Sequence, residues 1–239
     1  MYSKKSYPGN LYHVLNRGVD KRIIFIDKVD YLRFIRILYD FNNIEPVSNF
    51  SYFFAKQKQE NSIGFANRYG VGYNQGSRKV LVDVLAFVLM PNHYHLLLKP
   101  RIENGVTLFM KKINIGYANY FNKKYERSGA LFQGRYKSVI VTKEAHFIHL
   151  PYYIHANPLD LVIPEWRDGK VRNPKKAMDF LKSYRWSSFS DYIGRVNFPL
   201  TTQRDFLLEF VGGTTRYKIN FSEWLRAMDM DKLNSFTLE

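Results

Sequence analysis

Two apolar runs separated by a two-residue break stand in the middle of the chain, in the stretch LVDVLAFVLMPNHYHLLLKP. The first run, Leu81 to Met90, has the length and the Val, Leu and Phe content of a buried strand. The second run, His93 to Leu98, follows directly after Pro91-Asn92. Because a short break between two such runs is typical of a β-hairpin, we predict a pair of central antiparallel strands here.

Alternation of apolar and polar residues predicts two more strands, one at each end of this region. The first is Leu11 to Gly18, LYHVLNRG, and the second covers residues 130–141, ALFQGRYKSVIV. The stretches between and after these strands have helical composition instead. Strands and helices therefore alternate along the chain, and the sheet they predict is antiparallel at its centre.

Apolar residues at helical spacing predict a helix before the hairpin and another after it. The first covers residues 31–41, with Asp30 as its N-cap. The second covers residues 105–127. Its predicted apolar stripe consists of Leu108, Ile115, Ala118 and Phe121. A third helix over 144–156 contains Pro151, which either kinks it or begins a new helix at its first turn.

The least regular part of the chain, residues 44–78, mixes aromatic residues, Gly, Asn and Gln without a clean period. We interpret it as an insertion between the first helix and the central strand, because so long a loop is unusual inside a folded domain. The last part of the chain contains another helical stretch. We therefore predict a main domain over 1–195 that carries the 44–78 insertion, and a helical C-terminal extension over 196–239.

The charge balance is the strongest global property of the sequence. There are 36 Lys and Arg against 21 Asp and Glu, a net charge of +15, which attracts polyanions. Most of the 18 Tyr and 19 Phe are expected in the core, but such rings also stack on unpaired bases. The absence of Cys excludes disulfides and thiolate metal sites. Without a signal peptide or an apolar run of membrane length, we expect a cytoplasmic protein associated with the nucleoid.

The second strand of the hairpin carries the first candidate chemistry. His93 and His95 lie one pleat apart and project to one face, whereas Tyr94 projects to the other. Two imidazoles in this position can hold one divalent metal ion. The His-x-His pattern is short, however, and it also occurs in other metal hydrolases and on strands that bind no metal. Further ligands have to come from elsewhere in the chain.

The third helix offers an amide and a phenol for the same site. Tyr153 and Asn157 stand four residues apart and lie on one helix face if Asn157 keeps near-helical geometry. His149 lies four residues before Tyr153 and shares that face only if the helix continues through Pro151. His155 points elsewhere, and we expect it to be structural. Mg²⁺ or Mn²⁺ accepts nitrogen and oxygen ligands and leaves positions for phosphate oxygens. Tyr153 would then be a nucleophile that becomes covalently linked to a phosphate.

Several segments together carry a family resemblance. NHYHLLL, YFNKKYERSGALFQGRYKS, YYIHANPLDLV and YRWSSFSDYIG resemble the single-tyrosine HUH transposases of the IS200-like superfamily, and most closely the REP-associated tyrosine transposase-like subgroup. The opening YHVLNRGVDKRIIFID resembles the first strand and turn of that family. The resemblance covers roughly residues 7–43 and 80–195. It implies an α+β, ferredoxin-like domain with a central antiparallel sheet flanked by helices.

The resemblance also implies an activity and its residues. His93 and His95 would be metal ligands for Mg²⁺ or Mn²⁺, Asn157 would be the third ligand, and Tyr153 would be the nucleophile. The family cuts single-stranded DNA, leaves a 5′-phosphotyrosine and a free 3′-OH, rejoins strands without ATP, and recognises hairpins near the ends. Tyr152 is an alternative nucleophile, but only Tyr153 stands four residues before Asn157. The family contains dimers and monomers, so a homodimer stays an open alternative.

Basic residues near these motifs are candidates for contact with the DNA backbone. They are Arg17, Lys111, Lys112, Lys123, Lys124, Arg127, Arg135 and Lys137. The alternative for each is ordinary charge that faces solvent. Two other functions compete with the transposase: a domesticated protein that binds hairpin DNA without cutting it, and a small-molecule metal hydrolase.

Overall fold

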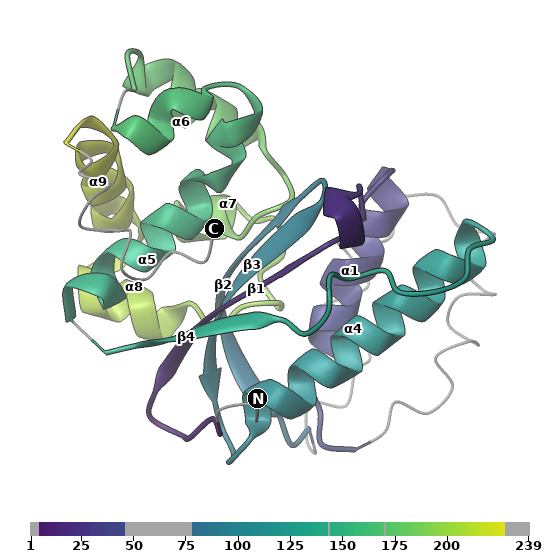
Figure 1. Ribbon diagram of the computed structural model, residues 1–239. Helices are drawn as coiled ribbons and strands as arrows, with labels where there is room; N and C mark the ends of the chain where they lie inside the picture. The colour runs from purple at the N-terminus through teal and green to yellow at the C-terminus, as the bar shows by residue number, and fades with distance from the viewer. Residues whose placement is uncertain (1–4, 46–77, 143, 170, 228–239) are drawn as a thin grey trace.

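A four-stranded antiparallel sheet with the strand order β2-β3-β1-β4 organises the molecule (Figure 1). This computed structural model describes residues 5–45, 78–142, 144–169 and 171–227. The strands are β1 (Leu11–Arg17), β2 (Val82–Met90), β3 (His93–Pro100) and β4 (Lys137–Val141). The predicted hairpin is confirmed as β2 and β3. Most of the predicted 44–78 insertion lies outside the described residues.

The helices connect the strands in the ferredoxin-like order β-α-β-β-α-β, so the predicted fold class is confirmed. They are α1 (Lys28–Asp40), α4 (Gly105–Lys124), α5 (Glu144–Ala156), α6 (Pro174–Ser183), α7 (Phe189–Tyr192), α8 (Asp205–Val211) and α9 (Gly213–Arg226). Short 3₁₀ segments are η1 (Val19–Lys21), η4 (Asn157–Leu161) and η5 (Pro164–Asp168). No helix among the described residues has the length and apolar character needed to cross a membrane.

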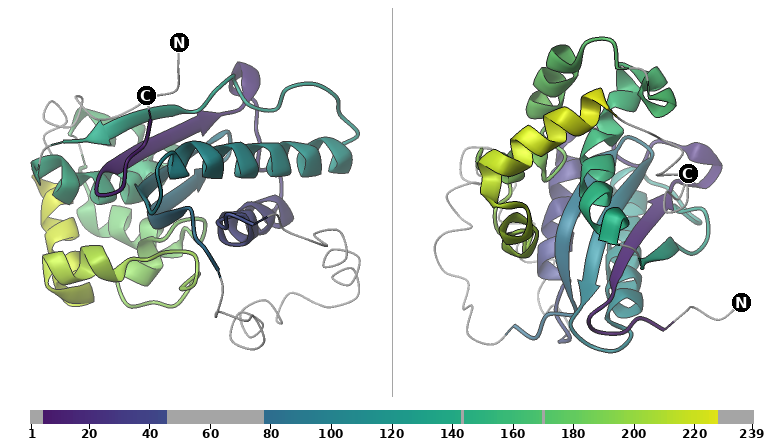
Figure 2. Two further views of the ribbon diagram at one scale, coloured as in Figure 1. Left: turned by 90° about the horizontal axis from the view of Figure 1, so that it is seen from below. Right: turned by 90° about the vertical axis from the view of Figure 1, so that its left-hand side faces the viewer.

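Helices cover both faces of the sheet. Figure 1 shows α1 and α4 on one face and α5 to α9 on the other, and Figure 2 shows α8 and α9 on the α5 side, away from α4. Strand alternation separates the two cores: Val14 and Tyr94 are buried on the α1 and α4 side, and Leu97 is buried on the α5 side. The sheet is therefore buried on both faces at its centre.

Two details of the predicted helices are wrong. The N-cap of α1 is Asp27, whose side chain accepts from the backbone N–H groups of Val29 and Asp30, whereas Asp30 occupies the third helical position of a capping box. On α4, Leu108 and Ile115 of the predicted stripe are exposed. The buried face is instead Val106, Phe109, Met110, Ile113, Tyr117 and Phe121. Both α4 faces carry apolar residues, so spacing alone did not select the one that meets the sheet.

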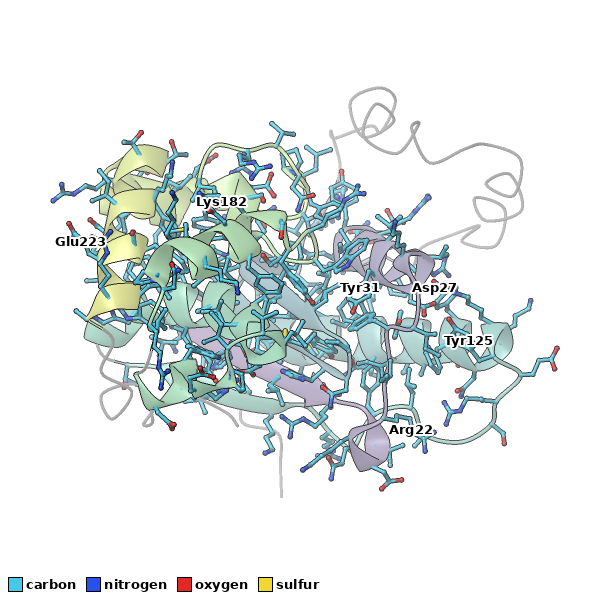
Figure 3. All side chains as sticks on the ribbon, turned by 90° about the horizontal axis from the view of Figure 1, so that it is seen from above. Arg22, Asp27, Tyr31, Tyr125, Lys182 and Glu223 are labelled. Atoms are coloured by element: carbon cyan, nitrogen blue, oxygen red, sulfur yellow. The ribbon has the colours of Figure 1, made fainter. Side chains whose placement is uncertain are left out.

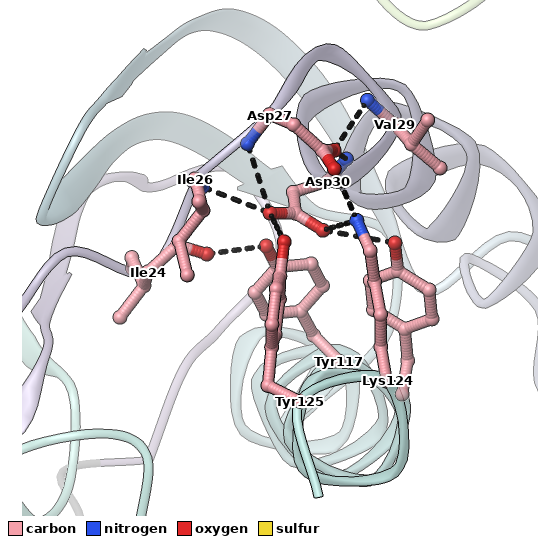
Figure 4. A network of polar contacts seen from close by, with 9 residues as sticks. Ile24, Ile26, Asp27, Val29, Asp30, Tyr117, Lys124 and Tyr125 are labelled. Carbon is pink, nitrogen blue, oxygen red and sulfur yellow. Dashed lines mark hydrogen bonds and ion pairs between the residues drawn. The ribbon is translucent and has the colours of Figure 1, made fainter.

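Asp30 connects α1 to α4 in a polar network (Figure 4). Its carboxylate is fully buried and accepts hydrogen bonds from the hydroxyls of Tyr120 and Tyr125, at 2.9 and 2.7 Å, and from the Lys124 ammonium at 2.7 Å. Burial opposes the charge on Lys124, but the hydrogen bonds from its ammonium to Asp27 and Asp30 outweigh burial and raise the pKa of Lys124 above its ordinary value. The network fixes how the two helices meet.

The predicted strand over 130–141 is correct only for its second half. Gly134 has a φ of +72°, which interrupts the extended backbone, and regular pairing with β1 begins at Lys137. The predicted C-terminal helices are confirmed as α8 and α9. Side chains of α9, Tyr217 and Phe221 among them, belong to the same buried cluster as Tyr152 of α5, so this cluster has members on both sides of residue 195. In Figure 3, Lys182 and Glu223 mark the layer of α6 and α9, and Asp27 and Tyr125 mark the opposite layer of α1 and α4.

Candidate active site

The face of the sheet that α5 covers carries the two predicted imidazole ligands. The ring centroids of His93 and His95 lie 5.2 Å apart. In the β1–β3 register, Arg17 is directly opposite His93 and Leu15 is directly opposite His95. Directly opposite residues share a face, so Arg17 projects to the same side as both imidazoles. Tyr94 is buried on the other side, where its hydroxyl donates to Asn114.

A third imidazole, His13 of β1, joins this face. Its Nε2 lies 2.8 Å from Nδ1 of His95, and the two rings stack with centroids 5.1 Å apart. His13 is fully buried. The sequence analysis assigned no role to His13. His13 and Arg17 are four residues apart on β1 and share a face. This position indicates a place beside His93 and His95 only once β1 is known to pair with β3.

Helix α5 brings the predicted nucleophile onto these imidazoles. The centroid of the Tyr153 ring lies 6.0 Å from that of His95 and 6.2 Å from that of His13. Pro151 lies inside the helix, so the helix continues through it. Beyond the end of α5, the Asn157 side-chain amide donates to the backbone oxygen of Tyr153 at 2.9 Å, which keeps Asn157 one turn from Tyr153 as predicted.

An arginine from η5 contacts both Tyr153 and Asn157. Nη1 of Arg167 donates to the Tyr153 hydroxyl oxygen at 3.0 Å, and Nη2 donates to Oδ1 of Asn157 at 3.3 Å. Asp160 holds the same guanidinium through two bonds, from Nε at 2.8 Å and from Nη2 at 2.5 Å. The sequence gives no signal for Arg167, because η5 is a short 3₁₀ segment without a period from which the direction of a side chain could be inferred.

The alternative nucleophile, Tyr152, lies in a different environment. Its ring packs against Tyr217, Phe221 and Trp224 of α9, with centroid distances of 5.1, 5.6 and 5.8 Å. Burial raises the pKa of the Tyr152 phenol above its ordinary value. His149 is near Tyr152, with ring centroids 6.2 Å apart, and thus lies on the Tyr152 side of α5.

The expectation that His155 is structural agrees with its contacts. The ring is fully buried, and its nitrogens lie 2.7 Å from the Tyr217 hydroxyl and 2.8 Å from the Ser188 hydroxyl. Burial lowers the pKa of His155 to about 3, so the ring is neutral at neutral pH. His155 thus connects α5 to α9 and to the segment before α7.

The chemistry of the donor set fits a divalent metal ion. Asn92 Oδ1 lies 2.6 Å from Nδ1 of His93, and the carboxamide oxygen can only accept, so His93 donates from Nδ1 and carries its lone pair on Nε2. Ligand imidazoles usually have their second nitrogen held in this way. Among the described residues, no three His, Cys, Asp or Glu side chains are arranged to hold a metal. A third ligand from this part of the chain would therefore be of another type, such as the Asn157 amide.

Comparison with known proteins gives one family and one solved structure of interest. The family model described as "Transposase IS200 like" matches residues 54–157. This segment of the chain is therefore similar to the IS200-like transposases. The solved structure is described as "Structure of the REP associates tyrosine transposase bound to a REP hairpin"; it covers 84% of this chain and 89% of its own, with 12% sequence identity and a TM-score of 0.48. The comparison with curated proteins finds no match.

The matched segment includes the predicted metal ligands and nucleophile: His93, His95, Tyr153 and Asn157. It also includes α4 with its predicted DNA-binding residues. His13 and Arg167 lie outside it, one on each side. The contacts that these two residues make with His95 and Tyr153 were therefore found in the three-dimensional structure and not in the family match.

The basic residues predicted to bind DNA are distributed over both faces of the sheet. Arg17 and Lys137 are paired with His93 and Leu15, so by register they lie on the face of the imidazoles. Nε of Arg17 is buried and has no hydrogen-bond partner among the described residues. Because an unpartnered buried guanidinium nitrogen is unfavourable, Arg17 is well suited to receive an anion beside His93.

The other basic residues are on α4 or in the segment after it. Lys111, Lys123 and Arg135 are exposed. Lys112 donates to the backbone oxygens of Asn43, Ile44 and Glu45, Lys124 is held by Asp27 and Asp30, and Arg127 donates to Asn122 at 3.2 Å. Since α4 covers the opposite face of the sheet, DNA that contacts both α4 and Tyr153 has to pass around an edge of the sheet.

Proposed function

We propose that this transposase cleaves and rejoins single-stranded DNA through a 5′-phosphotyrosine intermediate, that a divalent metal ion assists the reaction, and that hairpins at the DNA ends are recognised. One observation carries the proposal: the fold places Tyr153 of α5 against His95 of β3, with Asn157 one turn away. The family match supports the reaction class, because residues 54–157 include all of these residues.

The proposed step is a transfer of the phosphoryl group to tyrosine. Oη of Tyr153 forms a bond to the scissile phosphorus, and the bond from phosphorus to the 3′-oxygen breaks. The electron pair of the broken bond goes to the 3′-oxygen, which ends with a proton as a hydroxyl, while the phenol has lost one. A divalent ion held by His93, His95 and Asn157 would polarise the phosphate. Rejoining is the reverse attack by a 3′-hydroxyl, and no bond energy is lost between the two steps.

The burial of Tyr153 sets a condition on this reaction. Tyr153 has no exposed surface, and the residues beside it include Trp166 and Arg167 of η5. A scissile phosphate can reach the hydroxyl only if part of this cover moves. We therefore propose that binding of DNA moves part of this cover away from the Tyr153 hydroxyl before cleavage.

A denaturing gel tests the proposal directly. Purified protein is incubated with labelled single-stranded DNA from the flanks of its own gene, with Mn²⁺ or with a chelator. We expect a covalent protein–DNA band that depends on the metal and is lost in Tyr153→Phe. Tyr152→Phe is the matched control. This variant keeps Tyr153, and the ring at position 152 packs on α9, so folded Tyr152→Phe protein should still form the band.

Other outcomes would separate the alternatives. A band that persists in Tyr153→Phe but disappears in Tyr152→Phe would move the nucleophile by one residue. If no band forms on any hairpin-bearing flank, although the wild-type protein binds those DNAs tightly, the chain is a hairpin-binding protein and not a nuclease. Binding that does not depend on salt would favour a small-molecule substrate instead.

A further inference from the structure

We propose that Arg167 is a catalytic residue that binds the non-bridging oxygens of the scissile phosphate while Tyr153 attacks it. This inference rests on the proposed function and adds to it a cation supplied by the protein. Arg167 lies outside the family match, on η5. Its Nη1 is 3.0 Å from the hydroxyl oxygen that would form the new bond.

The guanidinium is held in a fixed orientation. Asp160 accepts two hydrogen bonds, one from Nε and one from Nη2, which is the bidentate arrangement that a carboxylate makes with arginine. The Asp160 carboxylate also accepts from the indole N–H of Trp166. These bonds fix the plane of the guanidinium, and the remaining terminal nitrogen, Nη1, points at Tyr153. A lysine in this place would supply a charge without this fixed direction.

The position of Arg167 also suits contact with a ligand from solvent. The Arg167 side chain is 27% exposed, whereas Tyr153 is completely covered. A phosphate that approaches Tyr153 from the η5 side meets the guanidinium before it meets the hydroxyl. The hydrogen bond that Arg167 now gives to a neutral phenol can then be exchanged for a stronger one to an anionic phosphate oxygen. That exchange would also uncover the attacking oxygen.

Chemistry at phosphorus explains why a cation is useful at this place. As the bond from Tyr153 forms and the bond to the 3′-oxygen breaks, negative charge is spread over the non-bridging oxygens and the two oxygens in line. Donors aimed at such oxygens lower the barrier without rearranging during the reaction. A phosphorus within bonding reach of Tyr153 Oη would lie near Nη1 of Arg167, because Nη1 is 3.0 Å from Oη.

The test compares a charged with a neutral scissile group. The cleavage site is first mapped from the wild-type covalent product, and the same DNA is then made with a methylphosphonate at that position. For Arg167→Gln we expect cleavage of the phosphate substrate to fall about 100-fold relative to wild type. On the neutral substrate we expect the loss to be less than about 10-fold, because the charge that Arg167 stabilises is absent. Arg167→Lys should keep more activity than Arg167→Gln, and Arg172→Gln, on a nearby exposed arginine, should behave as wild type.

Each outcome decides the proposal. An equal loss on both substrates means that Arg167 only supports the structure, and no loss means that it does not take part; either result overturns the inference. Both rates come from one protein sample, so their ratio does not depend on how much of a variant is folded. If wild type itself forms no covalent product while it binds the hairpin, the proposed function has failed before any Arg167 variant is compared.

Discussion

Two buried histidines of this molecule have different roles, one in the structure and one in the candidate site. His155 has both ring nitrogens in hydrogen bonds to hydroxyls and connects α5 to α9. His13 contacts His95 on the face of the candidate site. The two residues are equally buried, and only their partners show that the first is structural and that the second belongs to the site.

His155 should make stability depend on pH. Burial lowers its pKa from 6.5 to about 3 in the folded state, so between these values the unfolded chain binds the additional proton. Stability is therefore complete above the ordinary pKa and decreases as pH falls below it, by about 2 kcal/mol between about pH 7 and about pH 5. Urea unfolding at both pH values measures this loss. His155→Gln keeps a donor and an acceptor but cannot titrate, so its loss of stability between the two pH values should be smaller than that of wild type by about 2 kcal/mol. An equal loss of stability in wild type and variant would contradict the assignment of this pH dependence to His155.

His13 should control how well His95 can serve as a metal ligand. If His13 Nε2 accepts from Nδ1–H of His95, the lone pair of His95 is placed on Nε2, where a metal ion can use it. Loss of such a supporting partner typically costs 10- to 100-fold in metal affinity. We expect calorimetry with Mn²⁺ to show this decrease for His13→Leu, which removes the acceptor. His13→Gln can still accept and should bind Mn²⁺ more tightly than His13→Leu. Equal affinity of the two variants would show that the hydrogen bond has no role.

Helices α1 and α4 pack against each other on the face of the sheet opposite to α5. Gly116 of α4 faces Phe41 at the end of α1, and a Cβ at Gly116 would lie only 2.1 Å from the Phe41 ring, so the helices meet where no side chain fits. The Asp30 network lies at the same contact and includes both Tyr120 and Lys124 of α4. The contact therefore combines close backbone approach with a buried charge that is fully bonded.

Replacing Asp30 should weaken the contact between α1 and α4. In Asp30→Ala the Lys124 ammonium loses one of its two carboxylates, and two tyrosine hydroxyls and two backbone N–H groups lose their acceptor. Removing one partner of a buried ion pair typically costs about 3–5 kcal/mol. Urea denaturation of the two proteins measures the difference. The control is Asp20→Ala, where the carboxylate is exposed and the expected change is within about 0.5 kcal/mol. A loss below about 1 kcal/mol for Asp30→Ala would mean that the network contributes little.

At the scale of the whole molecule, charge and layering determine what can approach the site. The net charge of +15 favours a polyanion. Helices cover both faces of the sheet, and α5 packs on the imidazole face with Tyr153 beside His95. Arg17 and Lys137 lie by register on this same face, and α4 carries its basic residues on the other.

The affinity for hairpin DNA should decrease steeply with salt. If about six phosphates are neutralised, the dissociation constant should rise by more than about 100-fold from about 50 to about 200 mM salt, because counterions released on binding must be recaptured at a higher concentration. Fluorescence anisotropy over this range measures the slope. Arg17→Gln should reduce the slope by about one phosphate contact. Lys218→Gln, on an exposed position of α9, should leave the slope unchanged. Equal slopes in wild type and Arg17→Gln would remove Arg17 from the interface.

Several features of this protein follow from the sequence alone, because they depend on local periods. The two-residue period of a strand is sufficient to place His93 and His95 on one face and Tyr94 on the other. The helical period is sufficient to place Asn157 one turn after Tyr153. The ferredoxin-like sheet was implied by the resemblance of the motifs to a family, and the observed order of strands and helices confirms it. The charge of the chain also needs no structure.

Only the tertiary structure decided which of these local features meet. The pairing of β1 with β3 places His13 on His95, and the packing of α5 on the sheet places Tyr153 rather than Tyr152 beside them. Arg167 of η5 reaches Tyr153 while Asp160 of η4 holds its guanidinium. On α4, the sheet buries Val106 and Phe109 and leaves Leu108 exposed, although all three are apolar. The physical reason is the same each time: a period fixes directions within one element, whereas contacts between elements depend on which surfaces can be buried together at the lowest free energy.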